Sequence, residues 1–78
     1  SIAADSLGAR NVGAKVHAAC AANVDHVALV DDTAIRAAMK ALWSQMRIAA
    51  EPGGATALGA LLSGAYRPQK GERVGVLV

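Results

Sequence analysis

Large side chains are scarce in this sequence. It has no phenylalanine, and its only tryptophan and tyrosine are Trp43 and Tyr66. Hydrophobic residues make up 54% of the chain, but the commonest is alanine, which removes little apolar surface from water. A chain of 78 residues also buries a smaller share of its surface than a larger domain does. These two properties predict that the chain does not fold stably alone and packs against a larger body.

The sequence also lacks the features that stabilise many small proteins or direct them to a membrane or out of the cell. A single cysteine, Cys20, leaves no internal disulfide, and His17 and His26 have no zinc-type partners, so we predict no metal site. No apolar run approaches the roughly 20 residues of a membrane span, and no signal peptide is visible. The net charge of +2 is mild. We expect a cytoplasmic protein with no membrane partner and no nucleic-acid partner.

The two ends of the chain predict that it is part of a longer protein. It begins at Ser1 without an initiator methionine, and it stops inside the apolar run 73–78. Natural domains more often end in polar surface segments. No repeat, linker or change of composition divides the chain, so we expect one partial domain over residues 1–78.

Hydrophobic periodicity predicts three helices and two strands. Apolar residues at helical spacing indicate helices over 14–23, 32–46 and 52–63. Runs rich in β-branched residues indicate strands over 26–30 and 73–78. The order helix-strand-helix-helix-strand predicts an α/β fold, as a fragment of a three-layer sandwich.

The helix expected over 32–46 has the clearest apolar face, which we expect to lie in the core. Asp31 and Asp32 stand where N-caps are needed. Cys20 lies on the apolar face of the helix over 14–23 and is expected in the core as well. The residues of the clearest apolar face are Ile35, Met39, Leu42, Trp43 and Met46.

Residues 50–58 hold the most informative motif. Glu51 directly precedes Pro52, which suits the first position of a helix, and two glycines follow. The carboxylate then lies at the positive end of the helix dipole, and the glycines let backbone or a ligand come close. Two interpretations stay open from the residues alone: a cofactor or anion site, and an ordinary helix start that Glu51 stabilises.

Several segments resemble, in order and at family spacing, motifs of one group of enzymes. The family is that of the fold-type II enzymes that use pyridoxal 5′-phosphate (PLP), including threonine dehydratase, serine dehydratase and serine racemase. The matching segments are 2–8 with IADSL or IADG, 27–46 with VxLVSDEAIxxAMxxLWE, 51–55 with EP(S/G/A)GA, and 61–64 and 74–78 with the last helix and strand of the large domain.

The resemblance implies that this chain is the C-terminal part of the large domain of such an enzyme. The Schiff-base lysine and the tetraglycine loop would lie upstream, and the (S/C)GGN segment would begin beyond Val78. Lys15, Lys40 and Lys70 match no catalytic position, so no catalytic residue is expected in this chain, which should be inactive alone. With the remainder of the enzyme chain, and as a homo-oligomer, it would use PLP to convert L-threonine or L-serine to a 2-oxo acid and ammonia by β-elimination.

The resemblance also implies two cofactor-binding residues. Gly13 matches the glycine whose backbone lies against the cofactor ring, where a side chain would push on the ring. Glu51 matches the acidic residue of the EP motif, near the pyridine side of the site. From the residues alone, Gly13 is equally well explained as a breaker at a helix start.

Two other functions stay open beside the enzyme fragment. The chain could be a stand-alone interaction or regulatory module that packs against a larger partner through its alanine-rich faces. It could also bind nucleic acid through Arg36, Lys40 and Arg47, although no basic stripe or aromatic platform accompanies them. The ordered family motifs favour the enzyme fragment over both.

Overall fold

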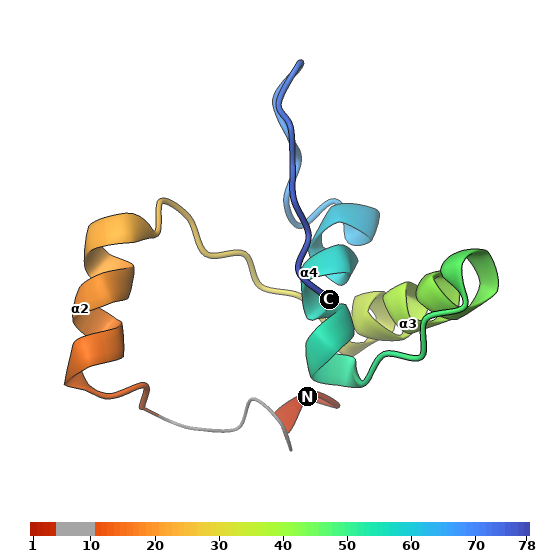
Figure 1. The fold of residues 1–78 in the computed structure, drawn as a ribbon, viewed down its shortest axis with the longest axis horizontal. Helices are drawn as coiled ribbons and strands as arrows, with labels where there is room; N and C mark the ends of the chain where they lie inside the picture. The colour runs from red at the N-terminus through yellow and green to blue at the C-terminus, as the bar shows by residue number, and fades with distance from the viewer. Residues whose placement is uncertain (5–10) are drawn as a thin grey trace.

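A computed structural model describes residues 1–4 and 11–78, which contain three labelled helices. Helix α2 spans Ala14–Asn23, α3 spans Asp32–Met46 and α4 spans Pro52–Ser63. The helices predicted from periodicity have these same bounds. Figure 1 shows α3 and α4 packed together, while α2 stands apart from both, joined to α3 by an extended segment.

Helix α3 has a defined cap at each end. The Oδ1 atom of Asp31 accepts a hydrogen bond from the backbone N–H of Ala34 at 2.8 Å, which confirms the N-cap predicted for Asp31. At the other end Arg47 adopts a left-handed backbone with φ 55°, and its N–H donates to the carbonyl of Trp43 at 3.0 Å. Residues other than glycine adopt this conformation rarely. Here the hydrogen bond from the N–H of Arg47 holds the last turn of α3 in place.

Helix α4 starts and stops as its sequence predicts. Pro52 lies in the first turn, and Gly64 ends the helix with a left-handed φ of 79°. Proline at the start has no N–H to leave unpaired, and glycine at the end takes a positive φ without a steric penalty. The bounds of α4 are therefore fixed by residues of the helix itself and its caps.

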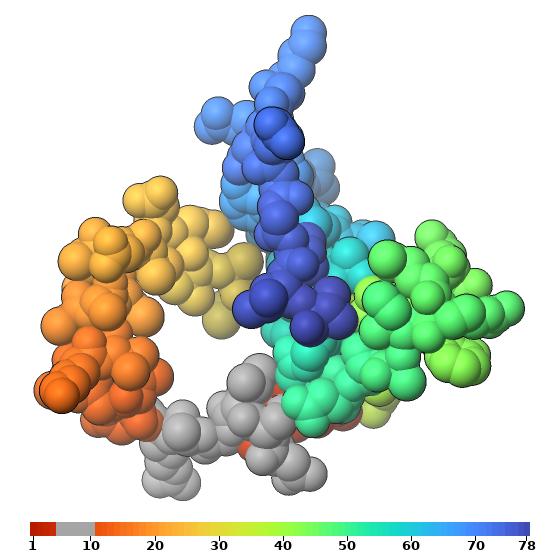
Figure 2. Space-filling model, in the orientation of Figure 1, coloured from red at the N-terminus to blue at the C-terminus, as the bar shows by residue number. Residues whose placement is uncertain are grey.

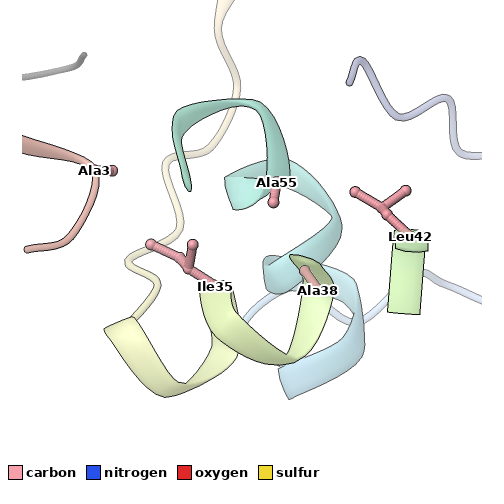
Figure 3. Packing of buried hydrophobic residues seen from close by; sticks show 5 residues of the cluster. All are labelled: Ala3, Ile35, Ala38, Leu42 and Ala55. Carbon is pink, nitrogen blue, oxygen red and sulfur yellow. The ribbon is translucent and has the colours of Figure 1, made fainter. Parts of the chain in front are cut away.

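A small core lies where α3 meets α4. Ile35 is only 1% exposed and is the largest fully buried side chain of the described residues. A Cβ added to Gly59 of α4 would come within 3.2 Å of the carbonyl oxygen of Ala34, so glycine lets the two helices touch. The buried apolar residues that form this core are Ala3, Ile35, Ala38, Leu42 and Ala55 (Figure 3).

Helix α2 has no packing partner among residues 1–4 and 11–78. None of its residues is buried, and it contacts neither α3 nor α4. Figure 2 shows open space between α2 and those two helices. The prediction that Cys20 lies in a core was wrong, because the face that carries this exposed thiol meets no other described element.

The apolar face of α3 is buried along only part of its length. Ile35 and Leu42 are buried as predicted, and Met39 is partly buried against the core. Trp43 is 55% exposed, so the prediction that it belongs to the core was wrong, and Met46 on the same apolar face is 64% exposed. A single neighbouring helix covers a narrower stripe than the sequence pattern presents.

The predicted α/β order was also wrong, because the described residues contain no strand and hence no layer of a sandwich. Segments 26–30 and 73–78 run without regular structure (Figure 1), and no backbone hydrogen bond joins either segment to another described residue. A strand exists only through hydrogen bonds to a neighbouring strand. Val27, Leu29 and Leu77, which the prediction placed in strands, are instead 76%, 89% and 90% exposed.

Candidate functional site

Glu51 is the N-cap residue of α4, and its carboxylate has no partner among the described residues. Its backbone is extended, with φ −73° and ψ 166°, and its carbonyl accepts the N–H of Ala55 at 3.1 Å. The side chain forms no capping hydrogen bond and is exposed. No residue of the described chain pairs with this carboxylate, so it can contact a group that these residues do not supply. Its effect on the helix dipole stays as a second, purely structural role.

Gly13 is the N-cap residue of α2 and has a positive φ of 85°. Its N–H donates to Oδ1 of Asn11 at 2.8 Å, and its carbonyl accepts the N–H of His17 at 3.0 Å. A Cβ at this position would meet nothing within 4 Å. The backbone conformation therefore explains glycine here, in agreement with a helix-start breaker, and the open space leaves room for a ring against the backbone.

The structure does not bring Gly13 and Glu51 together. Gly13 begins α2, which contacts neither of the other helices, whereas Glu51 begins α4. Two shallow pockets, of about 260 and about 370 Å³, lie along α3 and share Thr33 and Ala37 in their walls. Neither pocket includes a predicted site residue, so the two predictions are not joined into one site by the described residues.

The described residues contain neither a cluster of metal ligands nor a helix that could span a membrane. Within residues 1–4 and 11–78, no three His, Cys, Asp or Glu side chains are placed to hold a metal ion. None of the described helices is both long and apolar enough to cross a membrane.

Asp32 makes a contact that the sequence did not indicate. Two consecutive aspartates suggest two caps, but only Asp31 caps α3. The Oδ1 atom of Asp32 accepts the backbone N–H of Ile2 at 3.0 Å, across 30 positions of sequence. This hydrogen bond holds the pKa of Asp32 below its ordinary value of 3.8. The sequence cannot identify such a partner by its residue type, because every residue but proline offers a backbone N–H.

The loop after α4 is closed by a second contact that the sequence did not predict. The hydroxyl of Tyr66 donates to Oε2 of Glu72 at 2.5 Å, and the N–H of Gln69 donates to Oε1 at 2.8 Å. The hydrogen bond from Tyr66 lowers the pKa of Glu72, and the same contact raises the pKa of Tyr66. The ring of His26 lies 6.2 Å from that of Tyr66, so this loop meets the segment that precedes α3.

The exposed end of α3 carries an aromatic–cation pair. The guanidinium carbon of Arg47 lies 5.7 Å from the ring centroid of Trp43, within the range of a cation–π contact. The same guanidinium donates to the carbonyl of Trp43 at 3.4 Å. Arg36 and Lys40 lie elsewhere along α3, in the wall of the larger pocket. The three cations proposed for nucleic-acid binding are therefore divided between two different surroundings.

The described residues define a helical unit whose exposed apolar segments are typical of part of a larger globular protein. The chain belongs to the family of pyridoxal-phosphate dependent enzymes, whose sequence profile matches residues 1–78. The resemblance noted in the sequence is thus confirmed, and so is the PLP cofactor as that of the family.

Two curated relatives match parts of the chain. Phenylserine dehydratase of Ralstonia pickettii is 43% identical over 75 residues, which cover 96% of this chain and 23% of the relative. Serine racemase of Dictyostelium discoideum is 39% identical over 57 residues, which cover 72% of this chain and 18% of the relative. The chain therefore spans about a quarter or less of the length of these relatives. No solved structure matches it.

Proposed function

We propose that this chain is part of a fold-type II, PLP-dependent ammonia-lyase that deaminates L-threonine or L-serine by β-elimination. The observation that carries the proposal is the family match over residues 1–78, together with 43% identity to a protein named phenylserine dehydratase. The second relative is named for serine. Serine and phenylserine both carry a hydroxyl on the β-carbon, the group that leaves as water in such an elimination.

The exposed carboxylate of Glu51 fits a supporting role beside the cofactor. When bound, PLP supplies an electron sink for charge that develops at the α-carbon of an amino acid. An anionic side chain would repel the cofactor phosphate, so Glu51 suits the pyridine side of the site. There it would accept hydrogen bonds from backbone or side chains and orient them. We assign it no proton transfer.

Gly13 fits a contact against the face of the cofactor ring. Its positive φ of 85° and the empty space that a Cβ would meet leave one side of its peptide open. A flat ring can lie directly on such a backbone, whereas any side chain would hold it away. We propose that Gly13 and Glu51 approach the cofactor from different parts of the complete enzyme.

The full-length enzyme tests the activity. We expect it to bind PLP, seen by its absorbance, and to release ammonia and a 2-oxo acid from L-threonine or L-serine. We expect residues 1–78 alone to release neither product. Formation of D-serine from L-serine without any ammonia would overturn the proposed lyase activity and favour a racemase. Two results together would favour the stand-alone interaction module. The isolated residues 1–78 would show a cooperative thermal transition in circular dichroism, and the full-length protein would bind no PLP.

Matched variants test the two site residues in the full-length enzyme. Gly13→Ala should weaken PLP binding more than Gly71→Ala, because both glycines have a positive φ and open surroundings but only Gly13 is placed at the ring. Glu51→Gln should change the PLP absorbance or affinity more than Glu72→Gln. Equal effects within either pair would remove that residue from the cofactor site.

A further inference from the structure

The segment 1–4 is attached to the α3–α4 pair by two kinds of contact. The N–H of Ile2 donates to Oδ1 of Asp32 at 3.0 Å, and Ile2 itself packs partly against the core. Ala3 is 5% exposed and belongs to the same buried cluster as Ile35 and Ala55. Figure 3 shows these three side chains converging from three parts of the chain. Among the described residues, the segment is thus held by the carboxylate of Asp32 and by a small apolar contact.

This attachment lies beside the helix start that carries Glu51. Ala55 is in the first turn of α4, and its N–H donates to the carbonyl of Glu51 at 3.1 Å. Because Ala3 packs in the cluster that includes Ala55, the segment 1–4 runs next to the first turn of α4. In Figure 1 the N-terminus lies close to the beginning of this helix.

We propose that Asp32 is a positioning residue of the cofactor site, which holds the segment 1–4 against the first turn of α4 through the N–H of Ile2. The inference rests on the proposed function, because Gly13 and Glu51 are the two cofactor contacts proposed above. Asp32 touches neither of them and acts through Ile2. By holding the segment 1–4 in the core that includes Ala55, it limits where Glu51, at the start of the same helix, can lie.

The adjacent Asp31 supplies a matched comparison. Each aspartate accepts a backbone N–H through Oδ1, at 2.8 Å for Asp31 and 3.0 Å for Asp32. Asp31 caps its own helix three residues ahead, whereas Asp32 reaches a segment 30 positions away. Loss of either acceptor removes a backbone hydrogen bond of similar kind. Only the loss at Asp32 frees the segment 1–4.

The experiment compares Asp32→Ala, Asp32→Asn and Asp31→Ala in the full-length enzyme. We expect Asp32→Ala to raise the Kd for PLP about fivefold or more, as expected for the loss of one net hydrogen bond in positioning. Asparagine keeps an Oδ1 acceptor, so Asp32→Asn should stay within about twofold of wild type. Asp31→Ala should lower the unfolding midpoint, as a lost N-cap does, and leave the Kd unchanged.

Hydrogen–deuterium exchange at the Ile2 amide of the cofactor-free enzyme reads the contact directly. Slow exchange in wild type and in Asp31→Ala, with fast exchange in Asp32→Ala, supports the proposal. Fast exchange in wild type overturns it, and so does an equal rise in Kd for Asp32→Ala and Asp31→Ala. If Asp32→Ala does not fold, the Ile2 amide of the wild-type enzyme decides the question. A wild-type enzyme that binds no PLP would contradict the proposed function, while the exchange measurement still tests the contact.

Discussion

The α3–α4 pair and α2 are built from similar, alanine-rich sequence but have opposite surroundings. The pair is joined by a core around Ile35 and by the close approach at Gly59, whereas α2 buries no residue. Helix α2 has ten residues, and isolated helices of fewer than about 12 residues are marginal in water. The comparison shows that periodicity predicts where a helix forms, while packing depends on what the neighbouring chain supplies.

The largest expected effect is on the packed side of this comparison. Ile35→Ala in the full-length protein should lower the free energy of unfolding by about 2–5 kcal/mol, because it leaves a cavity between α3 and α4. Ile35→Val, which removes one methylene, should cost about 0.5–1.5 kcal/mol. Denaturant unfolding measures both values. A loss below about 1 kcal/mol for the alanine variant would mean that this core contributes little to the whole protein.

The glycine contact between the two helices should be the next most sensitive position. A Cβ at residue 59 would lie 3.2 Å from both the carbonyl oxygen of Ala34 and Cγ1 of Val30. Overpacking against backbone costs about 1–3 kcal/mol, which outweighs the gain of up to about 1 kcal/mol when alanine replaces glycine in a helix. We expect Gly59→Ala to destabilise the protein by about 1–2 kcal/mol in thermal unfolding.

Gly54 provides the control for Gly59 on the same helix. A Cβ there would meet only side-chain atoms, at 3.8 and 4.0 Å, which are ordinary contact distances. Gly54→Ala should therefore leave stability unchanged or raise it by up to about 1 kcal/mol. Equal losses for the two variants would show that the α3–α4 approach is not the cause.

A smaller loss of stability is expected at α2, and its size shows whether this helix stays exposed in the complete protein. Val16 is 51% exposed in residues 1–78, where no described element covers it. Because so short a helix needs a packing partner, we expect Val16→Ala to cost about 1 kcal/mol in the full-length protein. Chemical denaturation measures the loss, with Lys15→Ala as the neighbouring polar control. A change below about 0.5 kcal/mol would show that α2 stays uncovered and would preserve the contrast with the α3–α4 pair.

The smallest expected effects are local and depend on pH. The hydrogen bond to Glu72 raises the pKa of Tyr66, so the stabilisation from Tyr66 is complete below its ordinary value of 10.0 and is lost as the pH rises through the higher folded-state value. The pKa of Glu72 is lowered, so its contribution is present above 4.5 and is lost as the pH falls through the folded-state value. Loop closure should therefore hold across neutral pH.

Ultraviolet difference titration of the full-length enzyme against Tyr66→Phe isolates this tyrosine. We expect an apparent pKa above 10.0, and Glu72→Gln should bring it back toward that value. A pKa for Tyr66 that Glu72→Gln leaves unchanged would show that the loop is not closed by this contact.

Local signals account for what could be predicted from the sequence. The three helices, the Asp31 cap and the Pro52 and Gly64 boundaries of α4 depend on residues within a few positions of one another. The two predicted strands failed because a strand depends on a hydrogen-bonding neighbour, and residues 1–4 and 11–78 provide none for them. The prediction that Trp43 is buried failed for a related reason, since its burial depends on how much of α3 the neighbouring elements cover.

The candidate site shows the same division. Family motifs indicated Gly13 and Glu51, and the backbone at each position agrees with the residue found there. The contact of Asp32 with Ile2 could not be predicted, because a backbone N–H carries no signature in the sequence.

The near-contact at Gly59 has a mechanical consequence. With no side chain at residue 59, the backbones of α3 and α4 meet directly at this one point, and close-packed interiors transmit displacement. A shift of α3 at this point would therefore pass to the backbone of α4 without a side chain in between to absorb it.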